Sequence, residues 1–211
     1  MDGAPTVARR GPLHPGADVP DLAERRARLG TSEATAYVGM VVFLGSWAML
    51  FAALFFSYAL VRSRAPVWPP LDAPVPPRLL PALNTAVIAA SSAAVAGALR
   101  AAILGRRARV ARALAAATAL GAAFLALQAV VWVGLWREGL RIEGGPYPSV
   151  FYSLTALHAL HVAVGVGALA VLAARALRAP GPSRVAVRLW GMYWHFVGIV
   201  WGVLYATVYL L

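Results

Sequence analysis

Five long runs of the sequence contain no aspartate, glutamate, lysine or arginine, and charged segments separate them. The runs are residues 34–61, 79–99, 113–136, 144–174 and 189–211. A helix rises about 1.5 Å per residue, so about 20 apolar residues cross the core of a bilayer. Each run reaches that length. Backbone groups in lipid must be hydrogen-bonded within their own segment, so the pattern predicts an all-α polytopic bundle of five transmembrane helices.

The composition supports a membrane protein, because 61% of the residues are hydrophobic and only 13% are charged. We expect one membrane domain over residues 34–211. Its expected spans are about 36–62, 79–103, 112–136, 149–175 and 187–211. The preceding residues 1–33 are rich in proline and arginine and have no apolar secretory core, so we expect a disordered cytoplasmic segment with a short amphipathic helix at 21–28.

The net charge of +11 is a topology signal, since all 19 basic residues are arginines in the N-terminal segment and the connections. Fourteen of them lie in the N-terminal segment and in the connections around Gly105 and Pro180. Positive connections stay cytoplasmic, which predicts a cytoplasmic N-terminus and a periplasmic C-terminus in a bacterial inner membrane. This distribution gives no reason to expect a nucleic-acid partner. Cysteine is absent, which excludes disulfides and thiolate-ligated metal centres.

Few polar side chains interrupt the predicted spans, and none of them is an acid. They include Asn84, Ser91, Ser92, Gln128, His158, His161 and His195. A transmembrane proton or ion path usually needs ionisable groups at depth, and a transporter site usually needs broken helices as well. The inventory therefore disfavours a pump or transporter and favours hydrogen bonds between helices.

The histidines leave two interpretations open. His158 and His161 are neighbours on one helix face, and the expected spans bring His161 and His195 to similar depth. Two facing imidazoles could clamp a b-type haem. The other interpretation is that each ring hydrogen-bonds to a neighbouring helix. Zinc is disfavoured because no carboxylate or thiolate completes a ligand set.

Small residues recur every fourth position on the last two spans. They are Ala159, Ala163 and Gly167 on one, and Gly198 and Gly202 on the other. Such stripes let helix backbones approach closely in membranes, so they predict packing surfaces within the bundle or against another membrane protein.

Several segments, taken in order, resemble subunit III of the haem–copper cytochrome c oxidases in its five-helix form. These segments, all lying within residues 37–211, are "VGMVVFLGSWAMLFAALFFSYALVR", "PALNTAVIAASSA", "LGAAFLALQAVVW", "PSVFYSLTALHALHVAVG" and "YWHFVGIVWGVLYATVYLL". The resemblance covers nearly all of the predicted membrane domain.

The resemblance implies a non-redox accessory subunit of a terminal oxidase, without catalytic, cofactor or metal residues of its own. Haem and copper are then expected in partner subunits, with subunit I as the main contact, subunit II nearby, and membrane lipids around them. The implied roles are stabilising subunit I and supporting proton uptake, lipid binding and oxygen access in aerobic electron transport. A related protein that accompanies nitric oxide reductases and an independent b-type cytochrome remain as alternatives.

The sequence departs from the resemblance at three positions where subunit III commonly carries an acid inside the membrane. Trp47, Val131 and Gly198 stand at these positions. Functions that depend on those acids are therefore not expected to carry over unchanged.

Overall fold

The computed structural model describes residues 22–70, 73–74 and 76–210, and every regular element within these ranges is a helix. The elements are α1 (Leu22–Arg64), α2 (Leu79–Ile103), α3 (Arg107–Arg137), the short 3₁₀ turn η1 (Ile142–Gly144), α4 (Pro146–Ala176), α5 (Arg184–Leu204) and a π-helical extension η2 (Tyr205–Leu210). The segment expected to be disordered lies, up to residue 21, outside the described residues.

The predicted fold class is confirmed, because five of these helices are long and apolar enough to cross a membrane. The chain divides into two compact units, residues 1–36 and Tyr37–Leu211. The described part of the first unit is the start of α1. Residues 22–28, which fall within the short helix expected at 21–28, are helical and form the start of α1.

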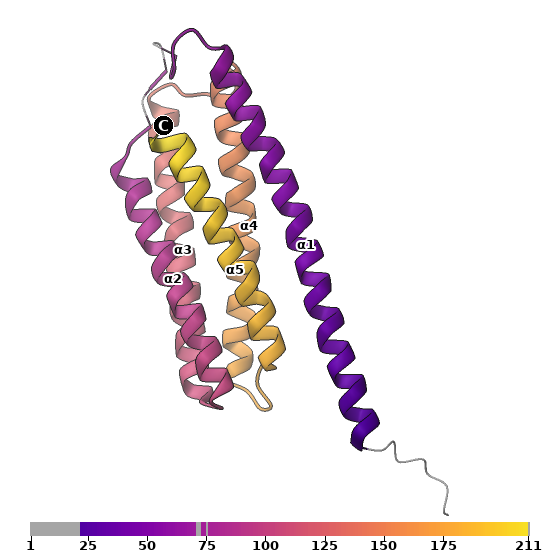
Figure 1. Ribbon diagram of the computed structural model, residues 1–211. Coiled ribbons are helices and arrows are strands. Elements are labelled where there is room, and N and C mark those ends of the chain that lie inside the picture. The colour runs from indigo at the N-terminus through magenta and orange to yellow at the C-terminus, as the bar shows by residue number, and fades with distance from the viewer. Residues whose placement is uncertain (1–21, 71–72, 75, 211) are drawn as a thin grey trace, which may run out of the picture. The chain divides into compact units, whose positions relative to one another are not determined.

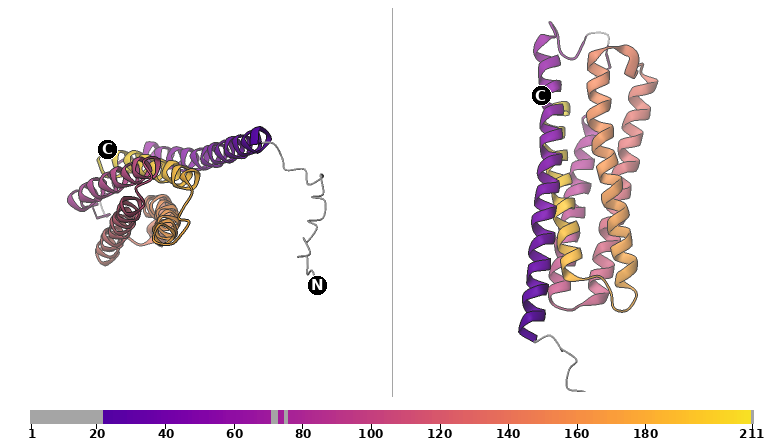
Figure 2. Two further views of the ribbon diagram at one scale, coloured as in Figure 1. Left: turned by 90° about the horizontal axis from the view of Figure 1, so that it is seen from below. Right: turned by 90° about the vertical axis from the view of Figure 1, so that its right-hand side faces the viewer.

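Within the second unit, α2 to α5 lie side by side as antiparallel neighbours (Figures 1 and 2). Helix α2 packs against α3 and α5, and α4 packs against the same two helices. The buried positions of α2 recur with the period of a helix, so one stripe faces the bundle. That stripe is Asn84, Ile88, Ser91, Val95, Ala98 and Ala101.

Local sequence signals set the helix ends. Pro146 opens α4, where a missing backbone N–H costs nothing because the first turn leaves it unpaired. At α5, the Ser183 side chain accepts a hydrogen bond from the backbone N–H of Ala186 at 3.1 Å. Gly105, which follows the C-cap residue of α2, has φ 68°, a conformation that glycine adopts without steric cost. These short connections make consecutive helices antiparallel.

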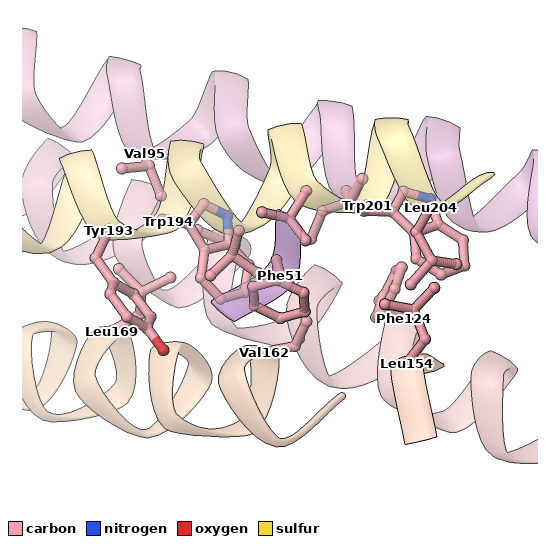
Figure 3. Close-up of a cluster of buried hydrophobic side chains, with 14 of the residues drawn as sticks. Phe51, Val95, Phe124, Leu154, Val162, Leu169, Tyr193, Trp194, Trp201 and Leu204 are labelled. Carbon is pink, nitrogen blue, oxygen red and sulfur yellow. The ribbon is translucent and has the colours of Figure 1, made fainter. Parts of the chain in front are cut away.

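The part of α1 that belongs to the second unit contacts α4 and α5 mainly through aromatic rings. Phe43 stacks on Tyr193 of α5 with ring centroids 6.5 Å apart, and Trp47 and Phe51 pack on His161 of α4. The opposite face of α1 is apolar and exposed. Val42, Met49 and Phe56 are exposed by 66%, 76% and 71%. Figure 3 shows Phe51 among the buried side chains between the helices.

Candidate functional site

His158 of α4 lies at the centre of an aromatic cluster drawn from three other helices. Its ring centroid is 6.3 Å from that of Phe51 on α1, 5.9 Å from Phe124 on α3 and 5.5 Å from Trp201 on α5. The Trp201 indole stacks on the imidazole, whereas the two phenyl rings approach at steep angles. His158 is 1% exposed, so it acts here as a packed aromatic ring.

Both ring nitrogens of His158 are buried, and neither has a hydrogen-bond partner among the described residues. The contacts that the structure gives this side chain are therefore those of packing. A hydrogen bond from His158 to another helix stays a prediction.

His161 faces α1, one turn further along α4. Its Nδ1 lies 2.7 Å from the carbonyl oxygen of Leu157, so the tautomer with a proton on Nδ1 donates to that oxygen. The indole of Trp47 meets the imidazole edge-on, with centroids 4.1 Å apart and planes at 80°. The hydroxyl of Tyr193 donates to the His161 carbonyl oxygen at 3.0 Å, which ties α5 to α4 at this level.

His195 has different surroundings. It lines a surface groove of about 330 Å³ between α2 and α5, together with Thr85, Ser92 and Gly198. Each residue advances about 100° around a helix, so His195 points away from the face on which Tyr193 reaches α4. His161 and His195 do not form the facing pair that the haem hypothesis requires. The described residues contain no cluster of three metal-ligating side chains.

A buried indole connects three helices near the middle of the bundle. Nε1 of Trp194 on α5 donates to the Ser91 hydroxyl on α2 at 3.1 Å, and that hydroxyl donates to the Ala117 carbonyl on α3 at 2.9 Å. The hydroxyl thus accepts one bond and donates another, as a buried serine can.

The six-membered ring of the same indole fits between two glycines. A Cβ atom at Gly121 of α3 would lie 2.7 Å from Trp194 Cη2, and one at Gly165 of α4 would lie 2.7 Å from its Cε3 and Cζ3. No side chain other than hydrogen fits either position without movement. Figure 3 shows Trp194 reaching inward from α5.

Two further sets of hydrogen bonds lie toward the C-terminal end of α5 and in η2. Trp201 Nε1 donates to the Thr85 hydroxyl at 3.0 Å. The Asn84 amide donates to Gln128 Oε1 at 3.4 Å, and the Gln128 amide donates to the Tyr209 hydroxyl of η2 at 3.3 Å. All of these groups are neutral, so they join α2, α3 and α5 without burying a charge.

A comparison of the sequence with known protein families shows to which family this bundle belongs. The sequence matches the profile of the family described as cytochrome c oxidase subunit III over residues 30–211. This chain belongs to the cytochrome c oxidase subunit III family.

Individual members of the subunit III family agree with this assignment. The cytochrome c oxidase subunit 3 of Formosania lacustris is 34% identical over 180 residues, which are 81% of this chain and 67% of that protein. The protein of the same name from the cyanobacterium Synechocystis sp. is 34% identical over 181 residues, 82% of this chain and 74% of that protein. The pig (Sus scrofa) protein is 33% identical over 180 residues. Membership makes the chain an accessory subunit of a haem–copper oxidase and a multi-pass membrane protein.

The three positions at which subunit III was expected to carry acids have unlike environments in this member. Trp47 packs on His161. Val131 is 1% exposed and belongs to the core of the bundle. Gly198 lies beside α2, where an added Cβ would be 3.3 Å from the Ser92 hydroxyl. These three positions are thus a packed ring, a core side chain and a close helix contact in this chain.

The small-residue stripes coincide only in part with the close contacts between the helices of this subunit, because Gly198 approaches Ser92 of α2 whereas other members of the stripes do not approach a neighbouring helix. Ala163, Gly167 and Gly202 are exposed, and added Cβ atoms at the two glycines would meet nothing within 4 Å. They do not bring two helices of this chain together. The closest approaches occur at Gly121 and Gly165, which spacing alone did not single out. Ala159 is half-buried on the same helix as Gly165.

Proposed function

We propose that this chain is the non-redox subunit III of a bacterial cytochrome c-type oxidase and that it packs against catalytic subunit I in the cytoplasmic membrane. The observation that carries the proposal is the match to subunit III across the whole described bundle. The exposed apolar face of α1 supports it, because Val42, Met49 and Phe56 suit either lipid or the surface of another membrane protein.

The subunit III resemblance predicts several roles, namely stabilising subunit I and supporting proton uptake, lipid binding and oxygen access. The interior of this chain favours the first. Several of its buried polar groups are neutral and form hydrogen bonds between helices, as with Ser91, Gln128 and Tyr209. A carboxylate at depth, which proton uptake would use, is replaced by Trp47 and Val131 at two of the expected positions.

Co-purification tests the association. A C-terminally tagged copy of the full chain, expressed in its own cells and extracted in mild detergent, should carry a haem-containing catalytic subunit that reduces oxygen with a c-type electron donor. The untagged strain is the control. Recovery of the tagged chain without any haem protein would overturn the proposal.

A second candidate function is that of a subunit III-like partner of a nitric oxide reductase. It is favoured because Trp47, Val131 and Gly198 stand where the subunit III resemblance leads us to expect acids. Such a reductase need not move protons across the membrane, so it would not need those acids. The same purified complex separates the two functions. Consumption of nitric oxide with no reduction of oxygen would select the second candidate.

Deletion of the chain tests the stabilising role. Oxidase from the deletion strain should begin turnover at a rate close to that of the complete complex and then lose activity sooner. Equal half-lives of activity during turnover would argue against stabilisation of subunit I.

The expected orientation has its own test. Connections α2–α3 and α4–α5 with their flanking turns carry nine arginines, whereas those at the other end carry five, which predicts a periplasmic C-terminus. Alkaline phosphatase fused after residue 211 should be active, and the same enzyme fused in the α2–α3 connection should not. The reverse result would invert the topology.

A further inference from the structure

Connections α2–α3 and α4–α5 lie at the same end of the bundle (Figure 1), where a partly open cavity of about 220 Å³ is lined by residues of both hairpins. The cavity wall is partly polar and partly apolar. Arg107 and Arg184 supply guanidinium groups, and Val110 and Ala176 supply apolar surface. Because one arginine begins α3 and the other begins α5, the site depends on both folded hairpins and not on one segment.

Arg107 is held in position across the two connections. Its Nη2 donates a hydrogen bond to the carbonyl oxygen of Arg178. Its guanidinium also lies against Gly181, where an added Cβ would be 3.2 Å from Nη2 and 3.3 Å from Nε. Gly181 has φ 86°, so this approach uses both the small size and the conformational freedom of glycine. A fixed cation therefore lies at the cavity wall.

Arg184 is the second cation of the cavity and the first residue of α5. Neither it nor Arg107 has an acid nearby in sequence, because residues 100–112 and 175–188 contain nine arginines and no aspartate or glutamate. Guanidinium groups bind phosphate through charge-assisted, frequently paired hydrogen bonds. The cavity thus has the charge and the donors for a phosphate group.

The surroundings indicate where the phosphate comes from. Leu104 and Leu177, one on each connection, are exposed by 63% and 80%, and Ile103 is exposed by 58%. Exposed leucines beside an arginine-lined cavity at the end of membrane-spanning helices suit the boundary between acyl chains and headgroups. A soluble phosphate would gain nothing from these apolar neighbours.

We propose that this cavity binds the phosphate of an anionic phospholipid, with Arg107 as a fixed donor, Arg184 as the second donor, and Leu104 and Leu177 against the upper part of the acyl chains. The site rests on the membrane location of the chain and is independent of the oxidase it joins. Failure of the co-purification experiment would therefore leave it standing.

Native mass spectrometry of the purified full chain in detergent tests the site with three probes. The probes are phosphatidylglycerol, phosphatidylcholine and inorganic phosphate. We expect phosphatidylglycerol to bind about tenfold more tightly than phosphatidylcholine, a difference of about 1.4 kcal/mol, which is the scale of one charged hydrogen bond. Inorganic phosphate should compete only weakly. Equal binding of the two lipids, or equal competition by phosphate, would overturn the proposal.

Two arginine variants localise the binding. Arg184→Gln should lower phosphatidylglycerol affinity to about that of phosphatidylcholine. Arg109→Gln removes the same charge from an exposed side chain that does not line the cavity, and it should leave the affinity within about twofold. An equal loss in both variants would show diffuse attraction to basic connections and would refute a defined site. Thermal unfolding of both variants without added lipid confirms that each is folded.

Discussion

The close packing of the Trp194 indole between Gly121 and Gly165 provides a test of how this bundle is packed. Gly165 lies against the indole so closely that a methyl group there would be 2.7 Å from Cε3 and Cζ3 and 3.2 Å from Cε1 of Tyr193. The indole cannot easily withdraw, because it is fully buried, Gly121 closes its other edge, and its Nε1 is bonded to Ser91. Replacing Gly165 with alanine should therefore overpack the core.

The magnitude follows from two opposing effects. Overpacking a well-filled core typically costs about 1–3 kcal/mol. Alanine is a better helix former than glycine by about 1 kcal/mol, which offsets part of that cost. Gly167→Ala provides the matched control, since Gly167 is on the same helix, is exposed and has nothing within 4 Å of an added Cβ. The propensity gain is common to both variants, so their difference isolates the steric cost.

The assay is reversible unfolding of the purified chain in mixed micelles with increasing denaturing detergent, followed by circular dichroism. Gly165→Ala should be less stable than Gly167→Ala by about 1–3 kcal/mol. In the background of Trp194→Phe, Gly165→Ala should cost less than it does in the native chain, because the smaller ring leaves room for the methyl group. Equal stability of the two alanine variants would refute the packing argument.

Three further sets of substitutions test the polar and aromatic contacts by the same unfolding assay. Trp201→Phe and Thr85→Val should each lower the free energy of unfolding by about 1 kcal/mol. The double variant should lose less than the sum of the two, because both substitutions remove the same hydrogen bond. Strictly additive losses would contradict that hydrogen bond. Ser91→Ala should cost about 1–3 kcal/mol, since it leaves the buried Trp194 N–H without its acceptor; an unchanged stability would contradict the bridge. His158→Phe should retain most of the stability that His158→Ala loses, because the His158 ring packs against other rings and its nitrogens form no hydrogen bond to any described residue. Equal losses in the two variants would show that the imidazole nitrogens have a role in the folded chain.

The sequence could predict the number and approximate bounds of the spans because lipid imposes a length and a polarity on them. The charge-free run 144–174 lies almost entirely within α4, which is Pro146–Ala176. The proline at its start and the Pro–Gly–Pro sequence after it agree with the ends observed. The span expected from about residue 112 differs more, because α3 begins at Arg107, where exposed arginines are good helix formers beyond the apolar core.

The rotation of each helix could not be predicted in the same way. A span that is apolar on all sides has no polar face to show which side is buried. The stripe at Ala163 and Gly167 therefore looked as suitable for packing as Gly165, yet Gly165 is the residue that meets Trp194. The same uncertainty let His195 be placed opposite His161, although it lines a groove on another side of α5.

The contacts of α5 explain how the bundle is fixed without intramembrane acids. Tyr193, Trp194 and Trp201 each place a large apolar ring in the core, and each donates one hydrogen bond to a neighbouring helix. A tyrosine or tryptophan thus supplies volume and a neutral donor together, at far lower desolvation cost than a carboxylate. Helix α5 is then positioned against α4 by one donor and against α2 by two. Trp47 continues this arrangement on α1, where a ring in place of the expected acid packs on His161. Positioning by neutral donors and ring packing does not depend on ionisation, so it needs no acid within the spans.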